Sequence, residues 1–155
     1  MRVFVLPALL VTLAACETPA PPPPAPEAPA LAEGRWTRTA SGDGHTASFA
    51  ERGARITVTC RAGAGNESHT IDLSLPGWSR EGPVAFTFDT GEALGLPFTL
   101  GAFAPQTTEQ SIRFDEAVSA LKSARRVTVT GQGAVPVDFS LRGSSRAIGD
   151  CVALL

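Results

Sequence analysis

The residues best suited to covalent or metal chemistry in this chain are its three cysteines and two histidines. A catalytic histidine needs a nucleophile or an acid oriented beside it, and a structural zinc site needs four protein ligands at characteristic spacings. His45 follows the Asp43-Gly44 turn, and His69 opens a predicted strand. Neither position fits a ligand set or a catalytic pair, so both histidines are predicted to be solvated polar residues.

The segment Gly143-Ser144-Ser145-Arg146-Ala147 partly resembles the G-x-S-x-G nucleophile elbow. The second glycine of that motif is Ala147 here, and no histidine follows the serine in the chain. Capping of a helix by Ser144 explains the same residues without catalysis. The neighbouring carboxylates Asp115 and Glu116 do not resemble a paired acid and base. We therefore expect no catalytic residue, no cofactor and no metal.

Cys16 lies at the end of a segment that looks like an export signal. Arg2 is followed by an apolar stretch from Val3 to Leu13, which is shorter than the about 20 residues of a permanent membrane helix. The sequence Leu13-Ala14-Ala15-Cys16 resembles the lipobox of bacterial lipoproteins. The resemblance implies lipid attachment to the thiol of Cys16, cleavage before it, and acylation of the new amine. Several acyl chains give stable anchoring. An ordinary secretory signal with a chance cysteine is the alternative.

Three segments follow from this interpretation: a signal peptide over 1–15, a lipidated cysteine with a proline-rich linker over 16–32, and a globular head over 33–155. The linker should form extended polyproline II and reach at most on the order of 50 Å, which makes it a spacer. Glu17 follows the cysteine. An aspartate there retains lipoproteins at the inner membrane of enteric bacteria, so we expect the outer membrane, with the head in the periplasm.

Lipidation of Cys16 would leave Cys60 and Cys151 as the remaining cysteines. Exported proteins usually join such a pair because the periplasm is oxidising, so a Cys60–Cys151 disulfide is predicted. A metal site is the rival interpretation, and it would need His45 or His69 to join the cysteines.

The head is predicted to be mostly β, as an antiparallel sandwich or a small barrel with two short helices, one of them C-terminal. Apolar residues alternate with polar ones in several short runs, which is typical of half-buried strands. The runs are Ile56-Val58-Cys60, Ile71-Leu73-Leu75, Val84-Phe86-Phe88, Val127-Val129 and Val135-Val137-Phe139-Leu141. Turns rich in glycine separate them at 42–44, 63–66 and 131–133.

Two helix starts are predicted from capping residues. Asp115 would cap the first helix, with Val118 and Leu121 on its inner face. Ser144 would cap the second, with Ile148, Cys151 and Val152 on its inner face. The disulfide would then fasten the last helix to the sheet.

The order of these features resembles small exported β-domains of Alphaproteobacteria, such as the invasion-associated locus B group. The shared features are Trp36, a strand ending in Cys60, a helix before two strands, and a closing small-residue helix with Cys151. The resemblance implies an envelope protein without known catalysis and carries over no functional residue. The lipobox and the proline-rich linker depart from that pattern.

The expected function is therefore non-catalytic binding of another envelope protein by a head anchored to a membrane. Inhibition of a lysozyme or protease is the alternative, and an enzyme of unrecognised type is the third. Loss of Arg2 with the signal leaves 12 basic and 15 acidic residues, without a basic patch, which argues against nucleic acid as a partner. Trp36 and Trp78 could join a binding surface, although such residues more often pack in a core.

Replacement of the lipidated residue tests the anchor. We expect Cys16→Ser to abolish labelling by radioactive fatty acid and to release the head from isolated membranes, because no other segment is predicted to hold the chain there. Undiminished membrane attachment of this variant would show that the lipobox interpretation is wrong.

Overall fold

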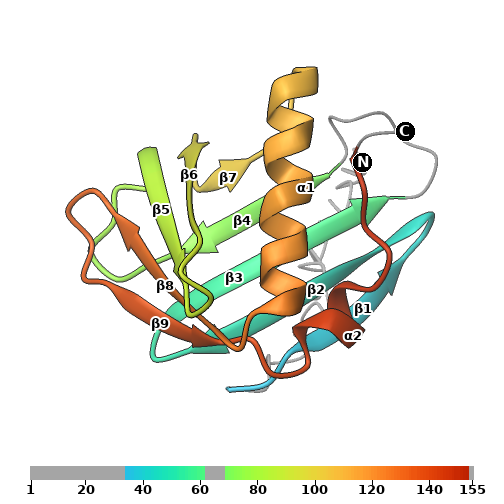
Figure 1. The fold of residues 1–155 in the computed structure, drawn as a ribbon, viewed down its shortest axis with the longest axis horizontal. Helices are drawn as coiled ribbons and strands as arrows, with labels where there is room; N and C mark the ends of the chain where they lie inside the picture. Colours follow the sequence, from blue (N-terminus) through green and yellow to red (C-terminus); the bar gives the residue numbers. More distant parts are fainter. Residues whose placement is uncertain (1–33, 62–68, 154–155) are drawn as a thin grey trace, which may run out of the picture.

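The head consists of two antiparallel β-sheets and two helices (Figure 1). The computed structural model describes residues 34–61 and 69–153. Cys16, the proline-rich linker and the turn predicted at 63–66 lie outside these residues. Within the described ranges, no helix is long and apolar enough to cross a membrane.

Sheet A has the strand order β1-β2-β3-β4-β7, and sheet B has the order β6-β5-β8-β9. Each pairing between neighbouring strands is antiparallel. The strands are β1 Thr37–Ser41, β2 Gly44–Glu51, β3 Ala54–Arg61, β4 Thr70–Ser74, β5 Gly82–Phe88, β6 Ala93–Phe98, β7 Ala102–Phe103, β8 Arg126–Gly131 and β9 Val137–Ser140. The predicted fold class is confirmed, with two separate sheets and no closed barrel.

The period-2 patterns place their apolar residues in one core between the sheets and helices. Ile56, Val58 and Cys60 of β3 are buried, and the polar residues between them lie on the other face of sheet A. In sheet B, the residues Val84 and Phe86 are fully buried. The rings of Phe49 and Phe139 lie edge to face with centroids 6.0 Å apart, which brings β2 of sheet A against β9 of sheet B.

Four strands were not predicted: β1, β2, β6 and β7. The inward residues of β2 include the small Ala47, so its alternation is weak. In β6, Leu94, Leu96 and Phe98 alternate well, but Gly95 and Pro97 disfavour a strand. Pro97 is tolerated because β6 is an edge strand of sheet B. At the other end of the sheet, Val135 lies before β9 and is 68% exposed, so it is not part of a buried strand face.

Helix α1 spans Thr108–Ser123 and packs its buried face into the core. Asp115 was predicted as its N-cap, and this is wrong: Asp115 lies in the middle of the helix, and Thr107 is the cap, accepting a hydrogen bond from the backbone of Gln110. Thr107 and Gln110 form the T-x-x-Q pattern of a helix start, which was visible in the sequence. Val118 and Leu121 face inward, as predicted.

Helix α2 spans only Ser144–Ile148. The predicted cap Ser144 is wrong, because the N-cap is Gly143, whose φ of 91° suits glycine. Ile148 is buried, but Cys151 and Val152 follow the helix, and Val152 is 50% exposed. The inward placement predicted for Val152 is therefore also wrong.

The predicted disulfide between Cys60 and Cys151 is confirmed, with the two Cα atoms 5.4 Å apart. It joins β3 to the closing segment 149–153, which follows α2, across 91 positions of the chain. Both cysteines are buried. The bond therefore fastens the C-terminal part of the head to sheet A.

Removal of the disulfide should destabilise the head without changing its strand pairing. For Cys60→Ala with Cys151→Ala, we expect the free energy of unfolding to fall by about 2–4 kcal/mol, because the unfolded chain loses a cross-link over a long loop. The melting temperature measured by circular dichroism should fall by roughly 10 °C. An unchanged melting temperature would contradict this role.

Candidate functional site

The structure brings both histidines beside the disulfide. His45 of β2 is the register partner of Cys60 in β3. His69 immediately precedes Thr70, whose partner in β3 is Thr59, so His69 reaches the other side of Cys60. Only 8% of His45 and 3% of His69 is exposed. The prediction that they are solvated is wrong, because both lie on the buried face of sheet A, as Cys60 does.

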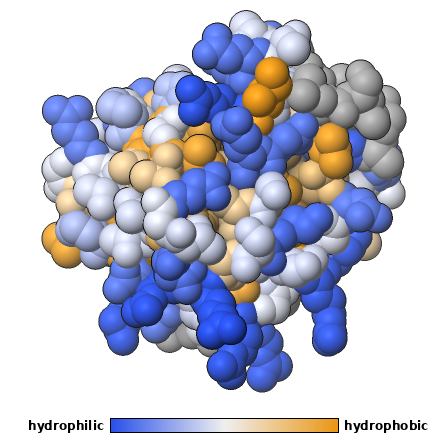
Figure 2. All heavy atoms as spheres, in the orientation of Figure 1, coloured by the Kyte–Doolittle hydropathy of each residue, from blue (hydrophilic) through white to orange (hydrophobic). Residues whose placement is uncertain are grey.

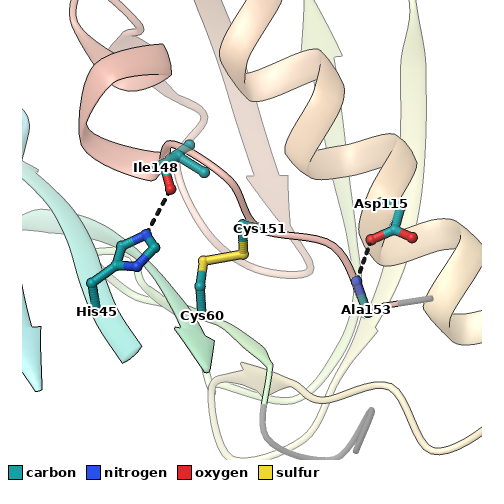
Figure 3. Close-up of a disulfide and its surroundings, with 6 residues drawn as sticks. All are labelled: His45, Cys60, Asp115, Ile148, Cys151 and Ala153. Atoms are coloured by element: carbon teal, nitrogen blue, oxygen red, sulfur yellow. Dashed lines mark hydrogen bonds between the residues drawn. A yellow bond between two sulfur atoms is a disulfide. The ribbon is translucent and has the colours of Figure 1, made fainter. Parts of the chain in front are cut away.

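His45 connects β2 to the end of α2 (Figure 3). Its Nε2 atom lies 2.6 Å from the carbonyl oxygen of Ile148. A carbonyl oxygen only accepts hydrogen bonds, so Nε2 carries the proton and donates. This ring is therefore held in one tautomer and one orientation.

His69 packs its ring against Phe114 of α1, with centroids 5.7 Å apart. Its Nδ1 atom is buried and has no hydrogen-bond partner within the described ranges. Burial lowers the pKa of His69 below its ordinary value because it disfavours the charged imidazolium, and the nearby Asp115 carboxylate only partly opposes this effect. His69 is therefore neutral at pH 7.

Asp115 holds the closing segment against α1. One of its oxygens, Oδ1, accepts a hydrogen bond of 2.7 Å from the backbone N–H of Ala153 (Figure 3). Together with the His45 contact and the disulfide, this bond attaches the chain from Ile148 to Ala153 at three points. The three attachments lead to different elements, β2, β3 and α1, so the path of the segment is well determined.

A groove of about 560 Å³ lies along this segment. Its lining includes the two histidines, the disulfide and charged residues of both signs. These residues are Arg38, Asp43, His45, Cys60, Arg61, His69, Asp150 and Cys151. Gly149 lies close to the guanidinium of Arg38: a Cβ at Gly149 would be 2.6 Å from its Nη1 atom. The groove offers fixed charges and hydrogen-bonding groups to a ligand.

Among the described residues that line the groove, no set of side chains matches a known reaction centre. The lining that comes from residues 34–61 and 69–153 includes no serine or threonine. Among residues 34–61 and 69–153, no three His, Cys, Asp or Glu side chains are grouped as metal ligands. The rival metal interpretation of the cysteines is overturned by their disulfide, which leaves no free thiolate.

Ser144 does not cap a helix as predicted; its buried hydroxyl forms hydrogen bonds with backbone carbonyl groups instead. It is only 1% exposed, and its hydroxyl lies 2.7 Å from the carbonyl oxygens of both Leu121 and Leu141. The hydroxyl therefore links the last turn of α1 to the start of α2.

The two tryptophans are in the core, each 7% exposed. The indole N–H of Trp36 donates to the carbonyl oxygen of Ser140, and that of Trp78 donates to the carbonyl oxygen of Glu81. Core packing is thus the correct choice between the two interpretations of these residues.

The arginines of the groove could not be recognised from the sequence. Arg38 and Arg61 lie in strands of ordinary polar composition, Thr-Arg-Thr and Cys-Arg, and 22 residues separate them. Only the register of sheet A brings them to the same end of the head.

Replacement of Ser144 tests the link between the helices. We expect Ser144→Ala to lower the free energy of unfolding by about 1–3 kcal/mol, because buried carbonyl groups lose their donor. The neighbouring Ser145 is exposed, so Ser145→Ala is the matched control and should stay within about 0.5 kcal/mol of the native chain. Equal effects in chemical denaturation would contradict the assignment.

The lowered pKa of His69 predicts a pH dependence of stability. The unfolded chain protonates this residue near its ordinary pKa of about 6.5, whereas the folded head resists protonation until a lower pH. Stability should therefore fall as the pH decreases from 7.5 to 5.5. In urea denaturation, His69→Gln should flatten this dependence; an unchanged slope would contradict the prediction.

Comparisons with protein-family models, with curated proteins and with solved structures gave no match for this chain. The resemblance to the invasion-associated locus B group stays a prediction from the pattern around Trp36, Cys60 and Cys151. The geometry of the groove and its position in the head are what the structure adds.

Proposed function

We propose that this protein is an envelope lipoprotein, anchored through Cys16 to the outer membrane, whose head binds another envelope protein through the groove beside the disulfide. The observation that supports this proposal is the position of the groove relative to the point where the linker joins the head. The two lie at opposite ends of sheet A.

The linker joins the head next to the end of β2. The backbone N–H of Gly34 donates to the carbonyl oxygen of Ala50, so the first described residues lie beside that strand end. The groove lies at the other end of β2, where Gly44 and His45 begin the strand and Arg61 ends β3. Six residues of extended chain separate Ala50 from Gly44, which corresponds to roughly 20 Å. A head tethered at one end would present the groove away from its anchor.

The charges of the groove favour a polypeptide ligand. Arg38 and Arg61 are exposed guanidiniums, and Asp43 and Asp150 are exposed carboxylates. A segment of protein chain supplies both backbone hydrogen-bonding groups and side chains of both signs. Complementary charges of this kind confer specificity and orient a partner.

A loop at the edge of the groove supports inhibition as the second candidate. The turn Gly42-Asp43 between β1 and β2 is exposed at the tip of the hairpin, where it could enter the active site of a lysozyme or protease. The identity of the captured partner separates the two functions: a secreted hydrolase favours inhibition, and a structural envelope protein favours the first proposal.

Crosslinking in intact cells tests the groove directly. A photoreactive amino acid at Asp43 or Val152, both exposed in the groove, should give a discrete crosslinked product identified by mass spectrometry. Thr130 is exposed on the outer face of sheet B and is the matched control. Equal crosslinking from Thr130 would contradict binding at the groove. The absence of a crosslinked product at every position would contradict it as well.

A further inference from the structure

Basic side chains gather at the end of the head where the linker enters. The indole N–H of Trp36 donates to the carbonyl oxygen of Ser140 at 3.0 Å, so the chain near Arg35 lies beside the chain near Arg142. Both arginines are exposed. Figure 2 shows strongly hydrophilic residues along the lower edge of the head, the edge at which β1 begins in Figure 1.

A depression of about 550 Å³ lies at the same end. Its charged lining residues are Glu51, Arg52, Asp89, Arg125, Arg126 and Asp138. We call Arg35, Arg52, Arg125, Arg126 and Arg142 the arginine face. Lys122, in the last turn of α1, and Glu92, in the turn between β5 and β6, lie at this end as well. Basic groups thus outnumber acidic ones here, although the mature chain as a whole is acidic.

The three carboxylates that line the depression each have a contact in the structure. Glu51 lies 3.7 Å from the guanidinium of Arg52, Asp89 accepts a hydrogen bond from the backbone N–H of Arg125, and Asp138 accepts one from the hydroxyl of Thr128.

Within the described part of the chain, the guanidiniums of Arg125 and Arg126 form no ion pair. Both guanidiniums are exposed and can contact a ligand, although Asp89 and Asp138 line the same depression.

We propose that the arginine face binds the phosphate groups of anionic phospholipids in the membrane that carries the anchor. The inference rests on the proposed anchor at Cys16, because the anchor is what holds this end toward a bilayer. Guanidinium groups match phosphate in charge and in the geometry of two parallel hydrogen bonds. An anionic bilayer attracts basic residues at its surface, and the attraction falls off within a Debye length of about 8–10 Å.

The linker allows this contact without enforcing it. A semi-rigid spacer attached at one end can lie along the bilayer as well as project from it, so a linker of at most on the order of 50 Å lets the head reach the surface. Because the anchor makes docking intramolecular, a weaker attraction is enough to populate the docked state than for an untethered head. In that state the groove at the opposite end points into the periplasm.

Vesicle binding by the unlipidated protein tests the proposal. The mature chain with Cys16→Ser should sediment with vesicles of phosphatidylglycerol and phosphatidylcholine at low salt, and should not sediment with phosphatidylcholine alone. Binding should decrease strongly toward 0.5 M salt, because surface charges are screened.

Matched pairs of variants locate the contact. Each arginine near an anionic surface is worth about fivefold in affinity, so Arg125→Gln with Arg126→Gln should weaken binding roughly 30-fold. The control, Arg38→Gln with Arg61→Gln, removes the same charge at the groove end and should change binding by less than about threefold. Arg52→Gln, at a side chain that is 88% exposed, gives an independent single variant, with a loss of about fivefold.

The proposal is overturned if the chain with Cys16→Ser alone does not bind anionic vesicles at low salt, if it binds phosphatidylcholine equally well, or if the two double variants lose equal affinity. Because the protein in this experiment has no lipid, these outcomes are independent of the anchor. Failure of the anchor would instead appear as unchanged membrane attachment of Cys16→Ser in cells.

Discussion

The disulfide between Cys60 and Cys151 is the constraint on which the candidate site depends. It holds the closing segment against β3, and the hydrogen bonds from His45 to Ile148 and from Ala153 to Asp115 hold the same segment on either side. The groove is the space between this segment and the end of sheet A. Each hydrogen bond contributes only about 1–3 kcal/mol, so the covalent bond is the strongest of the three attachments that form this wall of the groove.

The burial of the two histidines follows from that arrangement. Cys60 occupies an inward position of β3, so its neighbours His45 and His69 in the adjacent strands also face inward. His45 compensates for burial by donating to a carbonyl oxygen, and His69 does so by remaining neutral against the ring of Phe114. The imidazoles thereby line a site of fixed shape, a property that favours selective binding.

The two ends of sheet A have different chemistry. The linker end has an excess of arginine, while the groove end combines arginine, aspartate and neutral histidine. The packing of the two sheets contributes to this division, because Arg52, which follows β2 of sheet A, and Arg126, which begins β8 of sheet B, line the same depression. One end is thus suited to a simple charged surface and the other to a more specific partner.

The fold class and the disulfide could be predicted from local patterns and the cysteine count. The alternation in β3, β4, β5, β8 and β9 is a local signal, and the pairing of Cys60 with Cys151 was predicted by counting the cysteines of a chain that is expected to be exported. The T-x-x-Q pattern at Thr107 is also a local signal for a helix start, and the prediction of Asp115 as the cap missed it.

The burial of His45, His69 and Ser144 depends on long-range packing, and so does the position of Arg38 and Arg61 in one groove. A solvated histidine and a buried one have the same local sequence signature. The difference is made by elements far away in the chain, here α1 and the closing segment, which cover that end of the sheet.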